Sequence, residues 1–92
     1  MALLSDHQLQ EFTASYPEWG LAGDRIVRSF RFADFVEAMG FVTRVGLMAE
    51  RAFHHPDIDI RWNTVTLTLS THSEGGVTGK DLDLAAAISA IA

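Results

Sequence analysis

The sequence predicts an α+β fold in which one four-stranded antiparallel sheet carries three helices packed on one face, in the order α-β-β-α-β-β-α. Apolar and polar residues alternate along short stretches, which is typical of half-buried strands. Three such stretches and one short strand at residues 19–22 form two pairs, each separated by a brief turn. Three other stretches begin with helix-capping residues. Because a helix and an antiparallel sheet each have one apolar face, packing the helices on one side of the sheet buries both faces.

Length and composition limit the classes of protein that this chain can be. With 92 residues, of which 48% are hydrophobic, residues 1–92 are expected to form a single domain. The net charge is −5 and no run of Lys or Arg occurs, so nucleic acid is not expected as a direct ligand. The absence of cysteine excludes a disulfide framework and a thiol nucleophile. The chain shows no signal peptide and no apolar stretch of roughly 18 residues, so we expect a cytoplasmic protein that does not enter a membrane.

The first helix and the first hairpin follow from local signals. Residues 6–15 are predicted to be helical, because Ser5 is a good N-cap and Gln8 completes a capping box. Residues 19–22 and 25–32 are predicted to pair as a hairpin around a Gly-Asp turn. The second of these stretches alternates apolar and polar residues, so one of its faces should lie on the core.

The long helix is predicted over residues 35–53. Asp34 is its candidate N-cap, with Glu37 at the matching capping-box position. His55 precedes Pro56, which pushes its backbone out of the α region and ends the helix. The polar stripe of this helix is narrow, so its apolar arc is wider than the ~100° that one sheet requires. We therefore expect it to cover its own sheet and a second subunit.

The second hairpin and the last helix complete the fold. Residues 58–62 alternate apolar and polar side chains, Asn63-Thr64 is the expected turn, and residues 65–71 give the cleanest strand pattern of the chain. The last helix then begins after Thr78, its expected N-cap, with Asp81 at the third helical position.

Polar side chains gather at three predicted element ends. They are Glu50, His54 and His55 at the end of the long helix, Ser70, Thr71 and His72 at the end of the last strand, and Asp81 at the start of the last helix. Imidazoles exchange protons near neutral pH, so three of them around one pocket would suit general acid–base catalysis.

Each candidate also has a structural interpretation. His54 and His55 suit a helix C-terminus, where imidazolium complements the dipole. His72 could be a surface residue, Asp81 a capping residue, and Trp19 a core residue. Adjacent histidines on a helix would point about 100° apart, whereas metal-binding pairs are spaced i, i+3 or i, i+4. We therefore expect no metal site.

The spacing of the whole set resembles the signature of the pterin-4a-carbinolamine dehydratase family. The elements that carry the resemblance are Glu50, His54-His55-Pro56, Trp62, His72 and Asp81, with the stretches "FRFADFVEAMGFVTRVGLMAE", "LTLSTH" and "GGVTGKDLDLA". It covers roughly residues 19–85. The resemblance implies a hydro-lyase that dehydrates the 4a-hydroxytetrahydropterin released by aromatic amino acid hydroxylases, giving quinonoid dihydropterin and water in tetrahydropterin recycling.

The resemblance also implies roles for individual residues. His54, His55 and His72 would form the catalytic set without metal or cofactor, and we favour His54 as the base and His72 as the acid, a division that the sequence leaves open. The residues that match the substrate pocket are Glu50, Pro56, Ser70, Thr71, Asp81 and Trp19.

Three further expectations follow from the resemblance. Phe53 stands where the family often has Asn or Asp, so a polar substrate contact is expected to be missing there or replaced by packing. The family forms dimers and tetramers through the long helix and sheet edges, which agrees with the wide apolar face of the long helix. An alternative function is a protein-binding module of the same fold, coactivator-like, with little turnover.

Overall fold

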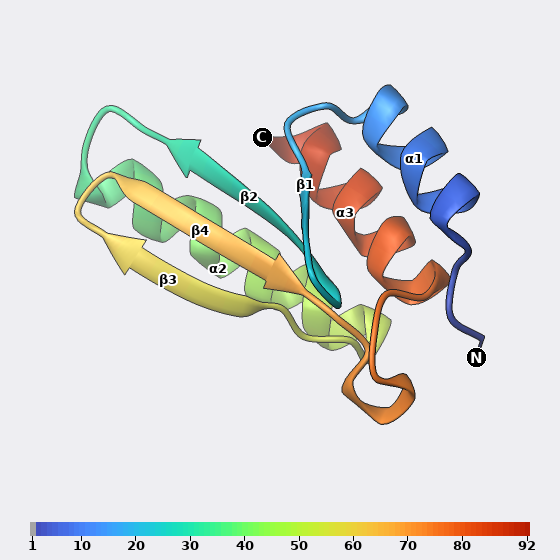
Figure 1. The fold of residues 1–92 in the computed structure, drawn as a ribbon. Coiled ribbons are helices and arrows are strands. Elements are labelled where there is room, and N and C mark those ends of the chain that lie inside the picture. The colour runs from blue at the N-terminus through green and yellow to red at the C-terminus, as the bar shows by residue number, and fades with distance from the viewer. Residues whose placement is uncertain (1) are drawn as a thin grey trace.

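The computed structural model describes residues 2–92 and confirms the predicted order of elements. They are α1 (Asp6–Ser15), β1 (Gly20–Ala22), β2 (Arg25–Arg31), α2 (Phe35–Ala52), β3 (Asp57–Arg61), β4 (Thr64–Leu69), the short 3-10 helix η1 (His72–Glu74) and α3 (Gly79–Ile91). The four strands form one antiparallel sheet in the spatial order β1-β2-β4-β3. In Figure 1, α2 passes behind β2, β4 and β3, while α3 and α1 continue the helical layer at the β1 end.

The sheet has one buried and one open face because its strands alternate. Val65, Leu67 and Leu69 of β4 are fully buried, and the strand register sets Leu69 opposite Ile26 of β2 on the same face. On the open face, the hydroxyls of Ser29 and Thr66 lie 2.8 Å apart across the two central strands. The buried face packs against α2 through a stripe with helical spacing, made of Ala38, Phe41, Val45 and Ala49.

Both ends of α2 differ slightly from the predicted pattern. Asp34 is the N-cap, and its carboxylate accepts the amide N–H of Glu37 at 2.9 Å, as expected. The reciprocal bond is shifted by one residue, because the Glu37 carboxylate accepts from the amide of Ala33 at 3.1 Å and not from Asp34. At the other end the helix stops at Ala52, and Phe53 adopts a left-handed backbone conformation with φ of 54°.

The predicted turn at Asn63-Thr64 is wrong by one residue. Arg61 pairs with Thr64, so the turn consists of Trp62 and Asn63, and Trp62 lies outside the strand and is exposed. The reason is the Asn63 side chain, whose amide donates to the Phe32 carbonyl at 2.9 Å. The Phe32 amide in turn donates to the Asn63 carbonyl at 2.8 Å, which ties the second hairpin to the end of β2.

A second face of α2 stays open to solvent within this chain. Val36 is 77% exposed and Leu47 is 69% exposed, although both are apolar. This confirms that the apolar arc of the helix is wider than one sheet can cover. No helix in the described part of the chain is long and apolar enough to cross a membrane.

Candidate active site

The end of α2 positions the histidine pair. The amide of Phe53 donates to the carbonyls of Ala49 and Glu50, and the amide of His54 donates to Ala49 at 3.2 Å. The left-handed conformation of Phe53 then turns the chain out of the helix. His54 and His55 therefore lie in the linker before β3 and not on the helix itself. Pro56, the last residue of this linker, is buried directly before β3.

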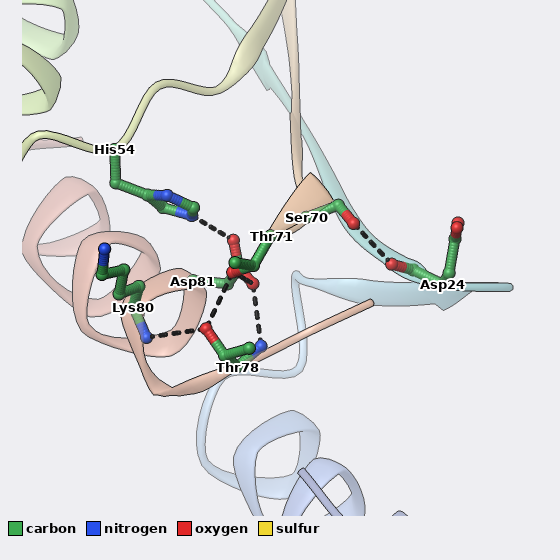
Figure 2. Close-up of polar contacts among 7 residues, drawn as sticks. All are labelled: Asp24, His54, Ser70, Thr71, Thr78, Lys80 and Asp81. Carbon is green, nitrogen blue, oxygen red and sulfur yellow. Dashed lines mark hydrogen bonds and ion pairs between the residues drawn. The ribbon is translucent and has the colours of Figure 1, made fainter. Parts of the chain in front are cut away.

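His54 is held by a buried carboxylate from α3. Its Nε2 atom contacts Oδ1 of Asp81, whose side chain is 0% exposed (Figure 2). The other carboxylate oxygen, Oδ2, accepts the Thr71 hydroxyl at 2.8 Å and the Thr78 amide at 2.9 Å. Asp81 therefore completes the predicted capping box of α3 with one oxygen and holds His54 with the other. Such a set of donors offsets the cost of burying a carboxylate.

The hydrogen bonds around Asp81 run in one direction. Thr71 has a single hydroxyl proton, which it donates to Asp81, so the 2.7 Å bond between the Thr71 and Thr78 hydroxyls is donated by Thr78. Thr78 in turn accepts the amide of Lys80 at 3.3 Å. The two groups bonded to Oδ2, the Thr71 hydroxyl and the Thr78 amide, thus both act as donors toward the carboxylate.

This direction fixes the tautomer of His54. Because the Asp81 carboxylate acts as an acceptor, the proton of the neutral imidazole belongs on Nε2. The Nδ1 atom is then left with a free lone pair. Within residues 2–92, no hydrogen bond reaches Nδ1 of His54, so this atom is able to accept a proton.

His55 forms a second histidine–carboxylate pair in a different environment. Its Nε2 atom lies 2.8 Å from Oε1 of Glu50, and the two side chains are 61% and 79% exposed. Exposed pairs of this kind are screened by water and contribute little to stability. Glu50 therefore orients His55 only weakly, whereas the buried carboxylate of Asp81 fixes the position of His54.

A polar hollow of about 310 Å³ brings the three histidines together. Its lining residues are Phe53, His54, His55, Ser70, Thr71, His72, Ser73 and Lys80. His72 enters it as the first residue of η1, in a loop closed by the 2.8 Å bond between the Thr71 amide and the Gly76 carbonyl. The Ser70 hydroxyl donates to the Asp24 carbonyl at 2.8 Å, which anchors this loop to the β1–β2 turn (Figure 2).

Other expected site residues lie elsewhere. Trp19 is buried in the core, where its indole N–H donates to the Ser89 hydroxyl at 2.9 Å and its ring meets Phe30 edge-on. Neither Trp19 nor Pro56 lines the hollow. Lys80 also lines the hollow, but it was not among the predicted site residues. Its position between the predicted capping residues Thr78 and Asp81 could have indicated that it lies near the site.

Two further features bear on ligands. His54 also lines a second hollow of about 450 Å³ between α2 and α3, whose walls include Met48, Ala52, Leu84 and Ala87. Among the described residues, no group of three or more His, Cys, Asp or Glu side chains is arranged to hold a metal ion.

Comparison with known proteins identifies the family. Residues 2–91 match the family model described as pterin 4 alpha carbinolamine dehydratase. The chain belongs to this family. A Nocardia farcinica protein provisionally named a pterin-4-alpha-carbinolamine dehydratase is 53% identical over 90 residues, covering 98% of this chain and 95% of the relative. A Chloroflexus aurantiacus protein with the same provisional name is 53% identical over 91 residues, covering 99% and 98%.

Two solved structures share the fold of this chain. A transcriptional coactivator/pterin dehydratase from Brucella melitensis superposes with a TM-score of 0.92 at 38% identity, over 97% of both chains. A pterin dehydratase-like protein described as a RuBisCO assembly factor in the alpha-carboxysome gives a TM-score of 0.66 at 18% identity, over 79% of this chain and 84% of that one. At that identity the second similarity shows the fold alone.

The backbone conformation at residue 53 disfavours the phenylalanine that this chain has there. Asn, Asp and Gly tolerate positive φ far better than bulky side chains do. Phe53 occupies such a conformation, at an expected cost of about 1–2 kcal/mol. The helix cap would therefore favour Asn, Asp or Gly over phenylalanine at this position.

Proposed function

We propose that this protein dehydrates 4a-hydroxytetrahydropterin to quinonoid dihydropterin and water, as a step of tetrahydropterin recycling for an aromatic amino acid hydroxylase. The observation that carries the proposal is the contact between His54 and the buried Asp81, at the wall of a hollow that His55 and His72 also line. It leaves one imidazole nitrogen as an oriented base. Acid and base groups in reach of one small ligand are what a dehydration needs.

The proposed reaction moves two protons. Nδ1 of His54 removes a proton from a ring nitrogen of the pterin, whose electron pair forms the C4a=N double bond as the C4a–O bond breaks. His72 donates a proton to the departing hydroxyl, which leaves as water. Proton exchange with solvent then returns both rings to their starting states. His55, oriented by Glu50, borders the same hollow and would bind the substrate or share proton transfer.

Stopped-flow measurement of dehydration tests this proposal. The substrate is 4a-hydroxytetrahydropterin generated chemically in the instrument, and its uncatalysed decay in the same buffer is the control. Purified protein should speed this decay in proportion to its concentration. If the decay equals the buffer control while the protein forms a stable complex with another protein, the alternative function as a binding module replaces the proposed one.

We also propose that copies of this chain associate through the open face of α2. Val36 and Leu47 expose apolar side chains there that no other part of residues 2–92 covers. Such faces commonly mark interaction sites. Leu47→Asp should therefore lower the mass measured by light scattering after size exclusion. Gln10→Glu, exposed on α1 and away from this face, introduces the same charge and is the control. A monomeric wild-type protein would contradict this assignment.

A further inference from the structure

Phe53 combines a strained backbone with an exposed aromatic ring. Its φ of 54° lies in the left-handed region that Gly and Asn normally occupy at helix ends. For a bulky residue this conformation is an outlier, and it persists only where the surroundings impose it. The surroundings here are the two carbonyls of α2, from Ala49 and Glu50, that accept the Phe53 amide. The cap explains the conformation but not the choice of phenylalanine.

Packing within the chain does not explain the aromatic ring either. Phe53 is 83% exposed, the most exposed of the large hydrophobic residues in the described part of the chain. The ring therefore gains little from burial in the folded chain. An exposed, strained phenylalanine at the edge of a site calls for an explanation in terms of ligand binding.

The composition of the hollow indicates what that ligand contact is. The three histidines that line the hollow are assigned to proton transfer or to substrate contact, and the other lining residues carry no ring, so Phe53 supplies the only apolar aromatic surface of this site. Side chains that bond to the edge of a heterocycle leave its flat faces uncovered. An aromatic ring at the rim can stack on such a face.

We propose that Phe53 is a substrate-binding residue that stacks on the planar pyrimidine part of the pterin and holds it against His54. This inference rests on the proposed function, because the pterin is the substrate that the proposed function assigns. Because Phe53 has a left-handed backbone conformation, its ring does not continue the rows of side chains on α2. The backbone strain at Phe53 is the stability cost of an aromatic side chain at this position. The stacked ring binds ground state and transition state alike, so its loss raises KM and leaves kcat nearly unchanged.

Three variants of Phe53 separate stacking from strain. Phe53→Tyr keeps the aromatic face, Phe53→Leu keeps an apolar side chain in the same unfavourable backbone, and Phe53→Asn suits that backbone but removes the ring. We expect Phe53→Asn to raise the Tm by about 4–8 °C. Phe53→Leu and Phe53→Asn should both raise KM, and the Kd of a dihydropterin measured by fluorescence titration, by about 3- to 10-fold. Phe53→Tyr should bind within about twofold of wild type.

The outcomes distinguish the two proposals. If wild type dehydrates the substrate but Phe53→Leu and Phe53→Asn bind dihydropterin as tightly as wild type does, the stacking role is wrong and the proposed function stands. If kcat falls with KM unchanged, Phe53 acts on the chemistry and not on binding, which also overturns the stacking role. If wild type neither binds dihydropterin nor accelerates dehydration, the proposed function fails and the stacking role fails with it.

Discussion

Replacing Asp81 by asparagine should lower kcat for carbinolamine dehydration by about 10²- to 10⁴-fold while the fold survives. The asparagine carbonyl can still accept the Thr71 hydroxyl and the Thr78 amide, so the cap of α3 is kept. Its NH₂ group then faces Nε2 of His54 and requires that nitrogen to accept. The proton of the neutral ring moves to Nδ1, which can no longer act as the base. Stopped-flow rates and a urea unfolding curve measure the two effects, and stability should fall by no more than about 2 kcal/mol.

Glu50→Gln is the matched control for this experiment. It makes the same carboxylate-to-amide change on the exposed pair with His55, where water can replace the lost interaction. We expect its rate to stay within about threefold of wild type. If Asp81→Asn and Glu50→Gln lowered kcat equally, burial of the His54–Asp81 pair would not be what decides the tautomer. Full activity in Asp81→Asn would remove the carboxylate from the mechanism.

Alanine at His54 or at His72 should also lower kcat by about 10²- to 10⁴-fold, but with different effects on stability. His72 is exposed at the start of η1, so His72→Ala should change the free energy of unfolding by no more than about 0.5 kcal/mol. His54→Ala removes a donor from the buried Asp81 carboxylate and should cost about 3 kcal/mol. Rates and unfolding curves measured on the same preparations separate the two contributions.

Alanine at the exposed residue Ser73, which lines the same hollow, is the control for these variants and should retain near wild-type activity. If His54→Ala and His72→Ala both keep the full rate, the assignment of base and acid is wrong. If only one of them loses activity, that histidine carries both proton transfers or shares them with His55.

The fold could be predicted from the sequence because its signals are local. The alternation of β4 and the capping residues Ser5, Asp34 and Thr78 each act within a few residues, so element order and helix starts followed directly. The turn at Trp62-Asn63 could not be placed, because it depends on a bond between Asn63 and Phe32, which is far away in the sequence. The open face of α2 was visible as an over-wide apolar arc.

The candidate site could be predicted only as a set of residues. Their spacing brought His54, His72 and Asp81 into one hypothesis, but the choice between a capping and a site role for Asp81 stayed open. The structure shows that the two oxygens of this carboxylate serve different partners, a division that no sequence pattern contains. The position of Trp19 in the core depends on packing against α3, which spacing along the chain does not report.

The proposed mechanism depends most directly on the position of one proton, the one on the neutral ring of His54. A long-range ¹H–¹⁵N correlation spectrum of histidine-labelled protein, recorded at a pH where this ring is neutral and assigned with His54→Ala, reports which nitrogen carries it. We expect the proton on Nε2 in wild type and on Nδ1 in Asp81→Asn. A wild-type ring protonated on Nδ1 would contradict the assignment of His54 as the base.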